Sequence, residues 1–299
     1  MQRDSILHCL TPAANLSPFD VNMAIDAGWQ HCIPYTGLGI GEVPALTQDA
    51  IFSRGPKGVW RTGLFIGGRD VHLAVDMLEA ARRSMVPPFE ISVFADPSGA
   101  FTTAAGMVAC AEKHLREGYD TPLDGRRVLV FGGTGPVGSI CGVLAAQAGG
   151  EVTLVSHESR AKAEQAAALC AQRYGVVLQG ADGSGDTAVR DLLATAELVF
   201  CAAPAGVQVL RAEQLRAATD LKVACDVNAV PPAGIEGVGA FDDGKIMTGV
   251  GAEARGIGAL AVGNVKYRTQ RELLERMLAG DQPSYLHFEQ AFAAARQHV

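Results

Sequence analysis

The sequence predicts an α/β protein of two domains, the second of them a doubly wound parallel sheet of the Rossmann type. Three observations support this prediction. The chain has 299 residues, which is more than one hydrophobic core usually serves. From residue 126 onward, short apolar strands alternate with helical patterns. A glycine-rich turn joins the first of these strands to a helix, and a domain's length of chain precedes it.

The second half of the chain is a run of strand–helix units. Strands are expected at 127–131, 152–155, 176–178, 198–202 and 222–226, and helices from 136 and at 160–173, 188–194 and 212–217. Such units imply a parallel sheet with helices on both faces. Glycine-rich segments at 149–150 and 180–185 fall between the elements, where turns belong.

The first 120 residues repeat this alternation less regularly. Strands are expected at 6–10, 31–35, 64–66 and 90–94, and helices at 19–26, 71–82 and 102–117. Residues 121–125 combine a proline with a turn-forming Asp-Gly pair and are the expected joint. We therefore expect an N-terminal α/β substrate domain of residues 1–122, joined by C-terminal helices at about 264–299, and a Rossmann domain of residues 123–263. A C-terminal helix near 263–278 is expected to cross back over the cleft between them.

Composition argues against several classes of function. A net charge of −7 without a basic run disfavours nucleic acid and anionic membranes as partners. No apolar run approaches the roughly 20 residues of a membrane span, and the first residues do not resemble a signal peptide, so a cytoplasmic location is expected. Seven histidines and seven cysteines show neither paired-histidine nor Cys-x-x-Cys spacing, so no bound metal is expected.

The glycine-rich turn predicts a dinucleotide site. In Gly133-Thr134-Gly135-Pro136-Val137-Gly138 the first glycine allows a tight bend and the second lets the backbone approach a pyrophosphate. The third glycine permits close packing of helix and strand, and the helix N-terminus offers N–H groups to the anion. A strand before the turn and a helix after it favour this interpretation over a merely structural turn.

The end of the second strand of this unit is expected to choose between NAD and NADP. Ser156 can donate to a 2′-phosphate, and His157 and Arg160 can supply positive charge. Glu158 can instead accept a hydrogen bond from a ribose 2′-hydroxyl. The pocket therefore predicts use of NAD or NADP, with solvated loop residues as the alternative for His157 and Arg160.

Other cofactor contacts are expected where later strands end. Ala202 and Ala203 leave room for a cofactor after the fourth strand, and Asn228 follows the fifth strand, where it is expected to border the nicotinamide. A short-chain dehydrogenase is disfavoured, because no tyrosine has a lysine four residues later.

Four further segments carry a resemblance to a known family. They are residues 18–21 (PFDV), 96–106 (DPSGAFTTAAG), 228–235 (NAVPPAGI) and 256–266, which ends in Gly-Asn-Val-Lys. Together with GTGPVG, these segments resemble the bacterial NAD(P)-dependent methylene-tetrahydromethanopterin dehydrogenases of one-carbon metabolism. The resemblance extends over nearly the whole chain and preserves the order of the segments.

The resemblance implies a reversible hydride transfer from the methylene group of a reduced pterin to the nicotinamide, as part of formaldehyde oxidation. It implies an active site in the cleft between the domains and a catalytic role for Lys266, with neither flavin nor metal. A desolvated lysine with a lowered pKa could orient the pterin or exchange a proton with its nitrogen.

The reaction creates a cation, so a carboxylate is expected close to it. Asp20 and Asp96 are the candidates for catalysis and substrate binding, with helix capping and turn formation as their alternatives. Thr102 and Thr103 open a helix that could receive the substrate, and they could instead cap it.

Two other functions remain open from the residues alone. One is a methylene-tetrahydrofolate dehydrogenase, with the same chemistry on a different pterin. The other is a non-catalytic sensor that binds NAD or NADP. A homo-oligomer is expected, although no sequence feature establishes one.

Overall fold

The computed structural model describes residues 3–280 and 282–299. The chain divides into two compact units. Unit 1 comprises residues 1–102, 267–294 and 298, and unit 2 comprises residues 103–266, 295–297 and 299. Each unit contains a largely parallel sheet with helices packed on it, which confirms the predicted α/β class.

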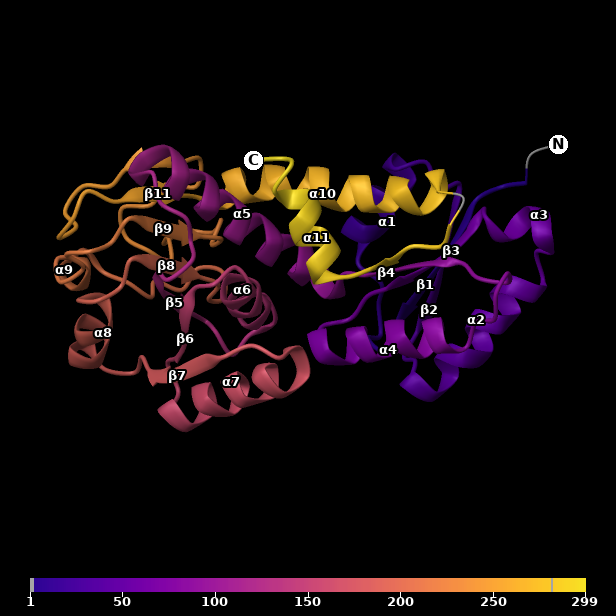
Figure 1. Cartoon of the computed structure of the whole chain (residues 1–299), viewed down its shortest axis with the longest axis horizontal. Helices are drawn as coiled ribbons and strands as arrows, with labels where there is room; N and C mark the ends of the chain where they lie inside the picture. The colour runs from indigo at the N-terminus through magenta and orange to yellow at the C-terminus, as the bar shows by residue number, and fades with distance from the viewer. Residues whose placement is uncertain (1–2, 281) are drawn as a thin grey trace. The chain divides into compact units, whose positions relative to one another are not determined.

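Unit 1 is built on five parallel strands in the order β12-β4-β3-β1-β2. The strands are β1 (Ile6–Thr11), β2 (His31–Thr36), β3 (Thr62–Ile66), β4 (Ser92–Ala95) and β12 (Tyr285–Leu286). Its helices include α1 (Pro18–Asp26), α2 (Val43–Phe52), α3 (Pro56–Val59), α4 (Val71–Arg83) and most of α11 (Phe288–Ala295). Figure 1 shows α2 and α4 on one face of this sheet and α1 on the other. The chain reverses direction across the sheet between β1 and β3, which is where doubly wound sheets bind ligands.

Aromatic side chains fill the core of unit 1. Phe65 on β3 meets Phe94 on β4 edge to face, with ring centroids 5.6 Å apart. Trp29 is 1% exposed, and its indole N–H donates to the Leu274 carbonyl at 3.2 Å. Since Leu274 lies far along the chain, this bond ties the C-terminal helix into the N-terminal sheet.

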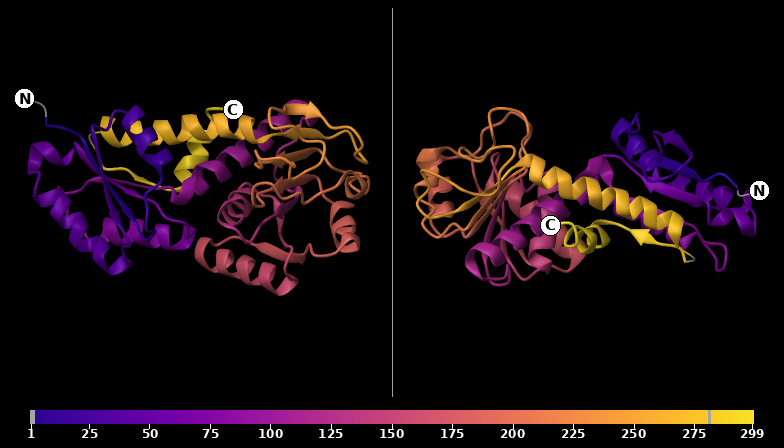
Figure 2. Two further views of the ribbon diagram at one scale, coloured as in Figure 1. Left: turned by 180° about the vertical axis from the view of Figure 1, so that it is seen from behind. Right: turned by 90° about the horizontal axis from the view of Figure 1, so that it is seen from above.

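Unit 2 contains seven strands in the order β10-β11-β9-β8-β5-β6-β7, and only β10 pairs antiparallel. The strands are β5 (Arg127–Phe131), β6 (Glu151–Ser156), β7 (Leu178–Asp182), β8 (Leu198–Cys201), β9 (Val223–Asp226), β10 (Asp243–Ile246) and β11 (Arg255–Ile257). Its helices are α6 (Pro136–Gln147), α7 (Arg160–Tyr174), α8 (Asp186–Leu193) and α9 (Ala212–Leu215), with most of α5 (Ala100–Tyr119) and the first part of α10 (Ala259–Ala279). Figure 2 shows α10 as one long, unbroken helix. The switch point of this sheet lies between β5 and β8.

Several local predictions differ from the structure; β4 begins at Ser92 rather than at 90, α8 begins at Asp186 rather than at 188, and α9 ends at Leu215 rather than at 217. The strand expected at 176–178 is β7 at 178–182, and α5 begins at Ala100 rather than at Thr102. Gly180, expected in a turn, lies inside β7, where an added Cβ would collide with the backbone of Ala163 and Glu164 on α7. The missing side chain therefore allows α7 to pack closely on this strand. The hairpin β10–β11 and the helix α2 were not predicted.

The two units do not follow the predicted domain boundaries in detail. Residues 121–125, the expected joint, follow α5, whereas the unit division falls at 102/103 in the first turn of that helix. Helix α10 starts in unit 2 and continues into unit 1 from Tyr267. The domain boundaries, and the cleft that α10 was expected to cross, stay predictions.

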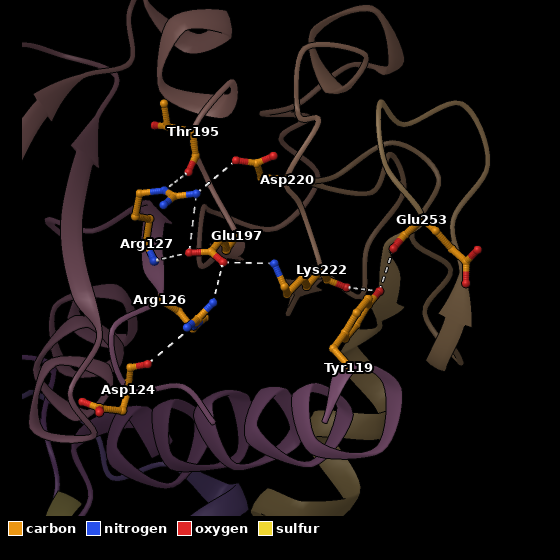
Figure 3. Close-up of polar contacts among 9 residues, drawn as sticks. All are labelled: Tyr119, Asp124, Arg126, Arg127, Thr195, Glu197, Asp220, Lys222 and Glu253. Atoms are coloured by element: carbon orange, nitrogen blue, oxygen red, sulfur yellow. Dashed lines mark hydrogen bonds and ion pairs between the residues drawn. The ribbon is translucent and has the colours of Figure 1, made fainter. Parts of the chain in front are cut away.

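A buried carboxylate holds the amino ends of three strands of unit 2 together (Figure 3). Glu197, which precedes β8 and is 4% exposed, accepts hydrogen bonds from Arg126 at 2.9 Å and from Lys222 at 3.0 Å. It also accepts the backbone N–H of Arg127 at 3.2 Å. Nearby, the Tyr119 hydroxyl lies 2.8 and 2.7 Å from the carbonyl oxygens of Lys222 and Glu253. These contacts lie at the sheet edge opposite to the glycine turn, so we interpret them as structural.

Candidate functional site

In unit 2, the turn between β5 and α6 (residues 132–138) forms a cradle in which three positions leave room only for glycine. Gly132 has a φ of 71°, and an added Cβ there would lie 2.7 Å from the carbonyl carbon of Ala202 in the loop after β8. An added Cβ on Gly133 would lie 2.7 Å from the Val130 oxygen, and one on Gly138 would collide with the carbonyl of Gly132. The turn is therefore packed against its own backbone and against the neighbouring strand end.

The positive φ of this turn belongs to Gly132 rather than to Gly133. The tight bend predicted at Gly133 is therefore made by Gly132. Gly133 is instead pressed against Leu154 on β6, where a Cβ would lie 2.9 Å from the leucine Cβ. The doubled glycine at 132–133 was the signal in the sequence that could have identified Gly132.

Gly135 differs from the other glycines of the cradle. It is the N-cap of α6, and an added Cβ would approach only the Gly132 oxygen, at 3.3 Å. Thr134, Pro136 and Val137 surround it and are at least partly accessible. A glycine with open space at a helix N-terminus suits the approach of a pyrophosphate. The cradle therefore fits a dinucleotide such as NAD or NADP.

The end of β6 carries several charged side chains. Ser156 is buried, and its hydroxyl accepts the N–H of Glu158 at 3.2 Å. His157 is exposed. Arg160 forms an ion pair with Glu164 at 2.8 Å. Lys162, which was not predicted, contacts Glu158 at 2.6 Å. The spacing of four residues across the start of a predicted helix could have revealed this pair.

The loop after β9 is held by its own side chains. Asn228 accepts N–H groups from Gly206 and Val230, each at 3.0 Å, and donates to the Pro232 carbonyl at 2.9 Å. Burial raises the pKa of Asp226, although the N–H groups of Asn228 and Ile235 donate to its carboxylate. Asn228 thus shapes the loop, and its predicted contact with the cofactor stays a prediction.

In unit 1, a pocket of about 550 Å³ lies where β1, β3 and β4 end. It is lined by the loop at 13–18, by Asp20, by the segment 67–69 and by Ser98. Ser98 has a φ of 52°, and its hydroxyl donates to the Gly68 carbonyl at 2.7 Å. The pocket therefore lies at the switch point of the sheet, next to a backbone conformation that is costly for serine.

Asp20 is the buried carboxylate of this pocket. It is 6% exposed and lies in the first turn of α1, whose N-cap is Ser17, so the alternative that Asp20 caps a helix starting at Val21 was wrong. Its Oδ1 accepts a hydrogen bond from Gln270 at 3.0 Å. Gln270 is 0% exposed and follows Lys266 by four residues in α10. The sequence contained no signal for Gln270 beyond this helical spacing.

Asp96 and Thr102 are engaged with each other at the start of α5. Asp96 is fully buried and accepts the N–H groups of Phe101 at 2.9 Å and Thr102 at 3.2 Å. The Thr102 hydroxyl donates to it at 2.6 Å. Asp96 therefore acts as the cap of α5, whereas Thr103 is half-buried. A role of Asp96, Thr102 or Thr103 in substrate binding stays a prediction.

Lys266 lies in α10 and is half-buried. Gly106 on α5 brings the two helices close together, because an added Cβ there would lie 3.2 Å from the Val262 oxygen and 3.6 Å from the Lys266 backbone nitrogen. The glycine of the TTAAG segment thus positions the helical turn that carries Lys266.

The described residues were predicted to hold no metal and no membrane span. Within residues 3–280 and 282–299, no three histidine, cysteine, aspartate or glutamate side chains are arranged to hold a metal ion. In the same ranges, no helix combines the length and the apolar character needed to cross a bilayer.

Comparisons with known proteins agree with these features. Residues 18–98 match the family model of the N-terminal part of methylene-tetrahydromethanopterin dehydrogenase. The chain is 47% identical to the NAD(P)-dependent methylenetetrahydromethanopterin dehydrogenase of Methylorubrum extorquens AM1, over 97% of both chains.

Two solved structures share the fold. The quinate dehydrogenase of Corynebacterium glutamicum superposes with a TM-score of 0.54 at 14% identity, over 97% of this chain and 98% of that one. The shikimate 5-dehydrogenase of Listeria monocytogenes gives a TM-score of 0.53 at 14% identity, over 91% and 92%. At this identity the likeness shows the fold alone.

Proposed function

This chain belongs to the family of NAD(P)-dependent methylenetetrahydromethanopterin dehydrogenases, and we propose that it transfers a hydride from methylene-tetrahydromethanopterin to NAD or NADP. The observation that carries the proposal is 47% identity to a dehydrogenase of that name over 97% of both chains. The glycine cradle of unit 2 supports it, because Gly132, Gly133 and Gly138 are packed too closely for a side chain, and Gly135 leaves the N-terminus of α6 accessible.

The reaction converts a neutral methylene compound into a methenyl cation and releases no proton. When bound, the oxidised nicotinamide supplies the acceptor for the hydride and its two electrons. The chain's own residues have to bind the two reactants, orient them and exclude water. We assign the dinucleotide to residues 132–138 of unit 2 and the pterin to the pocket of unit 1.

Asp20 is the residue that we assign to charge stabilisation. Its carboxylate lines the pocket and is buried, so its negative charge acts over a short, poorly screened distance on a cation bound there. Gln270 donates to the carboxylate and holds it in place. The product cation is thus stabilised more than the neutral substrate, which is what a lower barrier requires.

Lys266 is the second residue that we assign to the reaction. A charged ammonium beside the pterin would oppose formation of a cation, so the useful form of Lys266 is neutral or turned away from the reacting carbon. In that state it can orient the pterin ring by a hydrogen bond. Lys266→Ala is expected to lower turnover by orders of magnitude and to leave the dissociation constant of the dinucleotide within a few-fold.

The test of the proposal is the near-ultraviolet absorbance of reduced nicotinamide after the protein is mixed with each reduced pterin and each dinucleotide. Rapid reduction with methylene-tetrahydromethanopterin supports the proposal. Faster reduction with methylene-tetrahydrofolate would identify that pterin as the substrate instead. Tight dinucleotide binding without turnover on either pterin would indicate a sensor. The homo-oligomeric state and the cytoplasmic location stay predictions.

A further inference from the structure

We propose that Glu158 and Lys162 form an exchangeable ion pair through which this chain accepts both dinucleotides, with Glu158 binding the 2′-hydroxyl of NAD and Lys162 the 2′-phosphate of NADP. The inference deepens the proposed function, because it rests on binding of a nicotinamide dinucleotide in unit 2. It concerns the adenosine end of the cofactor and not the hydride transfer.

The pair lies at the end of β6, on the side of the sheet where the glycine cradle lies. Strand β6 lies next to β5, which leads into the glycine cradle, and β6 ends at Ser156. In sheets of this topology, the group at the adenosine 2′ position lies just beyond the end of this second strand. Glu158 and Lys162 occupy the loop and first helical turn that follow.

Two serines hold the backbone that carries the pair. The Ser156 hydroxyl accepts the N–H of Glu158 at 3.2 Å, and the Ser159 hydroxyl caps α7 by accepting the N–H of Lys162 at 3.3 Å. The backbone at both charged residues is therefore positioned, whereas their side chains remain able to move.

The side chains themselves form a weak, exposed pair. The Lys162 ammonium lies 2.6 Å from both oxygens of Glu158, and the two side chains are 50% and 48% exposed. An ion pair in water at this exposure is held loosely, because solvent competes for both charges. Either partner can therefore leave the other when a ligand offers a better contact.

Each dinucleotide offers such a contact to one partner. A ribose 2′-hydroxyl can donate to the Glu158 carboxylate while Lys162 stays beside it. A 2′-phosphate is repelled by Glu158 and attracts the ammonium of Lys162, whose flexible stem can turn toward it. Since the pair as a whole is neutral, it excludes neither dinucleotide. No covalent bond forms or breaks in this exchange.

Arg160 is one competing candidate for the phosphate, and the exposed His157 is another. The Arg160 guanidinium is paired with Glu164 at 2.8 Å, further along α7. A phosphate at the end of β6 would therefore have to draw Arg160 away from Glu164, a carboxylate that lies further along the helix and is not repelled at close range by the phosphate. The same phosphate repels Glu158, the present partner of Lys162, and attracts the Lys162 ammonium. Both effects favour movement of Lys162 from Glu158 to the phosphate.

The experiment measures the dissociation constants of NAD and NADP by calorimetric titration of the full chain without pterin. Lys162→Met is expected to weaken NADP about tenfold, the value of one charge-assisted hydrogen bond, and to leave NAD within about twofold. Glu158→Gln is expected to act in the opposite direction, with NAD weakened several-fold and NADP tightened. Added salt is expected to reduce the effect of Lys162→Met.

The matched control is Arg271→Met. Arg271 forms a pair of the same spacing with Glu275 at 2.7 Å and similar exposure, 48% and 46%, in unit 1. Loss of the Arg271 guanidinium is expected to leave the dissociation constants of NAD and NADP unchanged. Equal weakening of NAD and NADP by Lys162→Met would overturn the proposal, as would a loss of NADP binding in Arg160→Met with none in Lys162→Met. If the affinities for NAD and NADP change as expected but the protein does not turn over the pterin, the proposed reaction is contradicted and the role of the ion pair is not.

Discussion

Gln270 is a single buried residue that holds the carboxylate of Asp20. Its side-chain amide donates at 3.0 Å; Gln270 is fully buried and Asp20 is 6% exposed. A buried hydrogen bond to an ionised carboxylate favours the charged form and fixes its orientation. We therefore regard Gln270 as a positioning residue for the proposed reaction.

Gln270→Leu is expected to lower kcat/KM for the pterin at least about tenfold, because one hydrogen bond to a charged group is lost. The loss is expected in kcat and not in KM, since the carboxylate loses the donor that orients it. Dinucleotide binding, measured by calorimetry, should be unchanged. A rise in KM with an unchanged kcat would reduce Gln270 to a packing role.

The glycines of the cradle allow a second test at the residue scale. An added Cβ at Gly135 meets only the Gly132 oxygen, at 3.3 Å, so Gly135→Ala is expected to fold normally. Its methyl group would nevertheless occupy the approach of the pyrophosphate, and we expect the dissociation constant of NAD to rise at least about tenfold. Calorimetry measures the affinity, and circular dichroism verifies the fold.

Gly138→Ala provides the contrast. A Cβ there would collide with the Gly132 carbonyl and lie 2.9 Å from the Gly133 Cα, so α6 would have to move. This variant is expected to lose stability as well as binding. Normal affinity in Gly135→Ala would show that the cofactor does not approach the backbone at this point.

Among the elements, α5 depends on an acid that lies outside it. Asp96 precedes the helix and accepts three hydrogen bonds from its first turn, including one from the Thr102 hydroxyl at 2.6 Å. Both residues are fully buried, so removal of the carboxylate leaves donors without a partner in the protein core. The same acid was a catalytic candidate, and a stability measurement separates the two roles.

Asp96→Ala is expected to destabilise unit 1 by about 2 kcal/mol, the upper range for loss of a helix cap. Both tryptophans, Trp29 and Trp60, lie in unit 1, so their fluorescence during urea unfolding reports on this unit. Asp96→Asn retains an acceptor and should lose less. If both variants were as stable as the wild type, the cap would contribute little.

The periodicity of the sequence predicted most strands and helices, and packing explains where it failed. Gly180 is typical of a turn by composition, yet it lies in β7, where α7 occupies the space that a Cβ would need. The short strands β10 and β11 were missed because they have only four and three residues, and because β11 joins the sheet through β9, which lies far from it in the sequence. Neither contact leaves a local signal.

On the scale of the whole molecule, acid stability is expected to depend on Glu197. Burial by itself would raise the pKa of Glu197, but hydrogen bonds from Lys222, from the Arg127 N–H and from Arg126 hold it below its ordinary value of 4.5. A carboxyl group with a lowered pKa stabilises the folded state when it is ionised. Its contribution is therefore complete well above pH 4.5 and is lost as the pH falls through the lower, folded-state pKa.

Glu197→Gln is expected to destabilise unit 2 by about 2 kcal/mol at neutral pH, less than for a fully buried pair because the three basic side chains are partly exposed. The difference from the wild type should shrink as the pH is lowered below 4.5. Hydrogen exchange in β5, β8 and β9 measures it, since unit 2 contains no tryptophan. A difference that is independent of pH would assign the loss to packing.

The sequence by itself determined the fold class, the place of the glycine turn and the likeness to the dehydrogenase family. These features depend on local order: alternation of strands and helices, glycine spacing and segments that keep their residues in sequence. Tertiary structure alone decided that Asp96 caps α5 and that Gln270 holds Asp20. Gln270 and Asp20 are separated by 250 residues, and a contact between such distant positions arises only when packing brings their helices together.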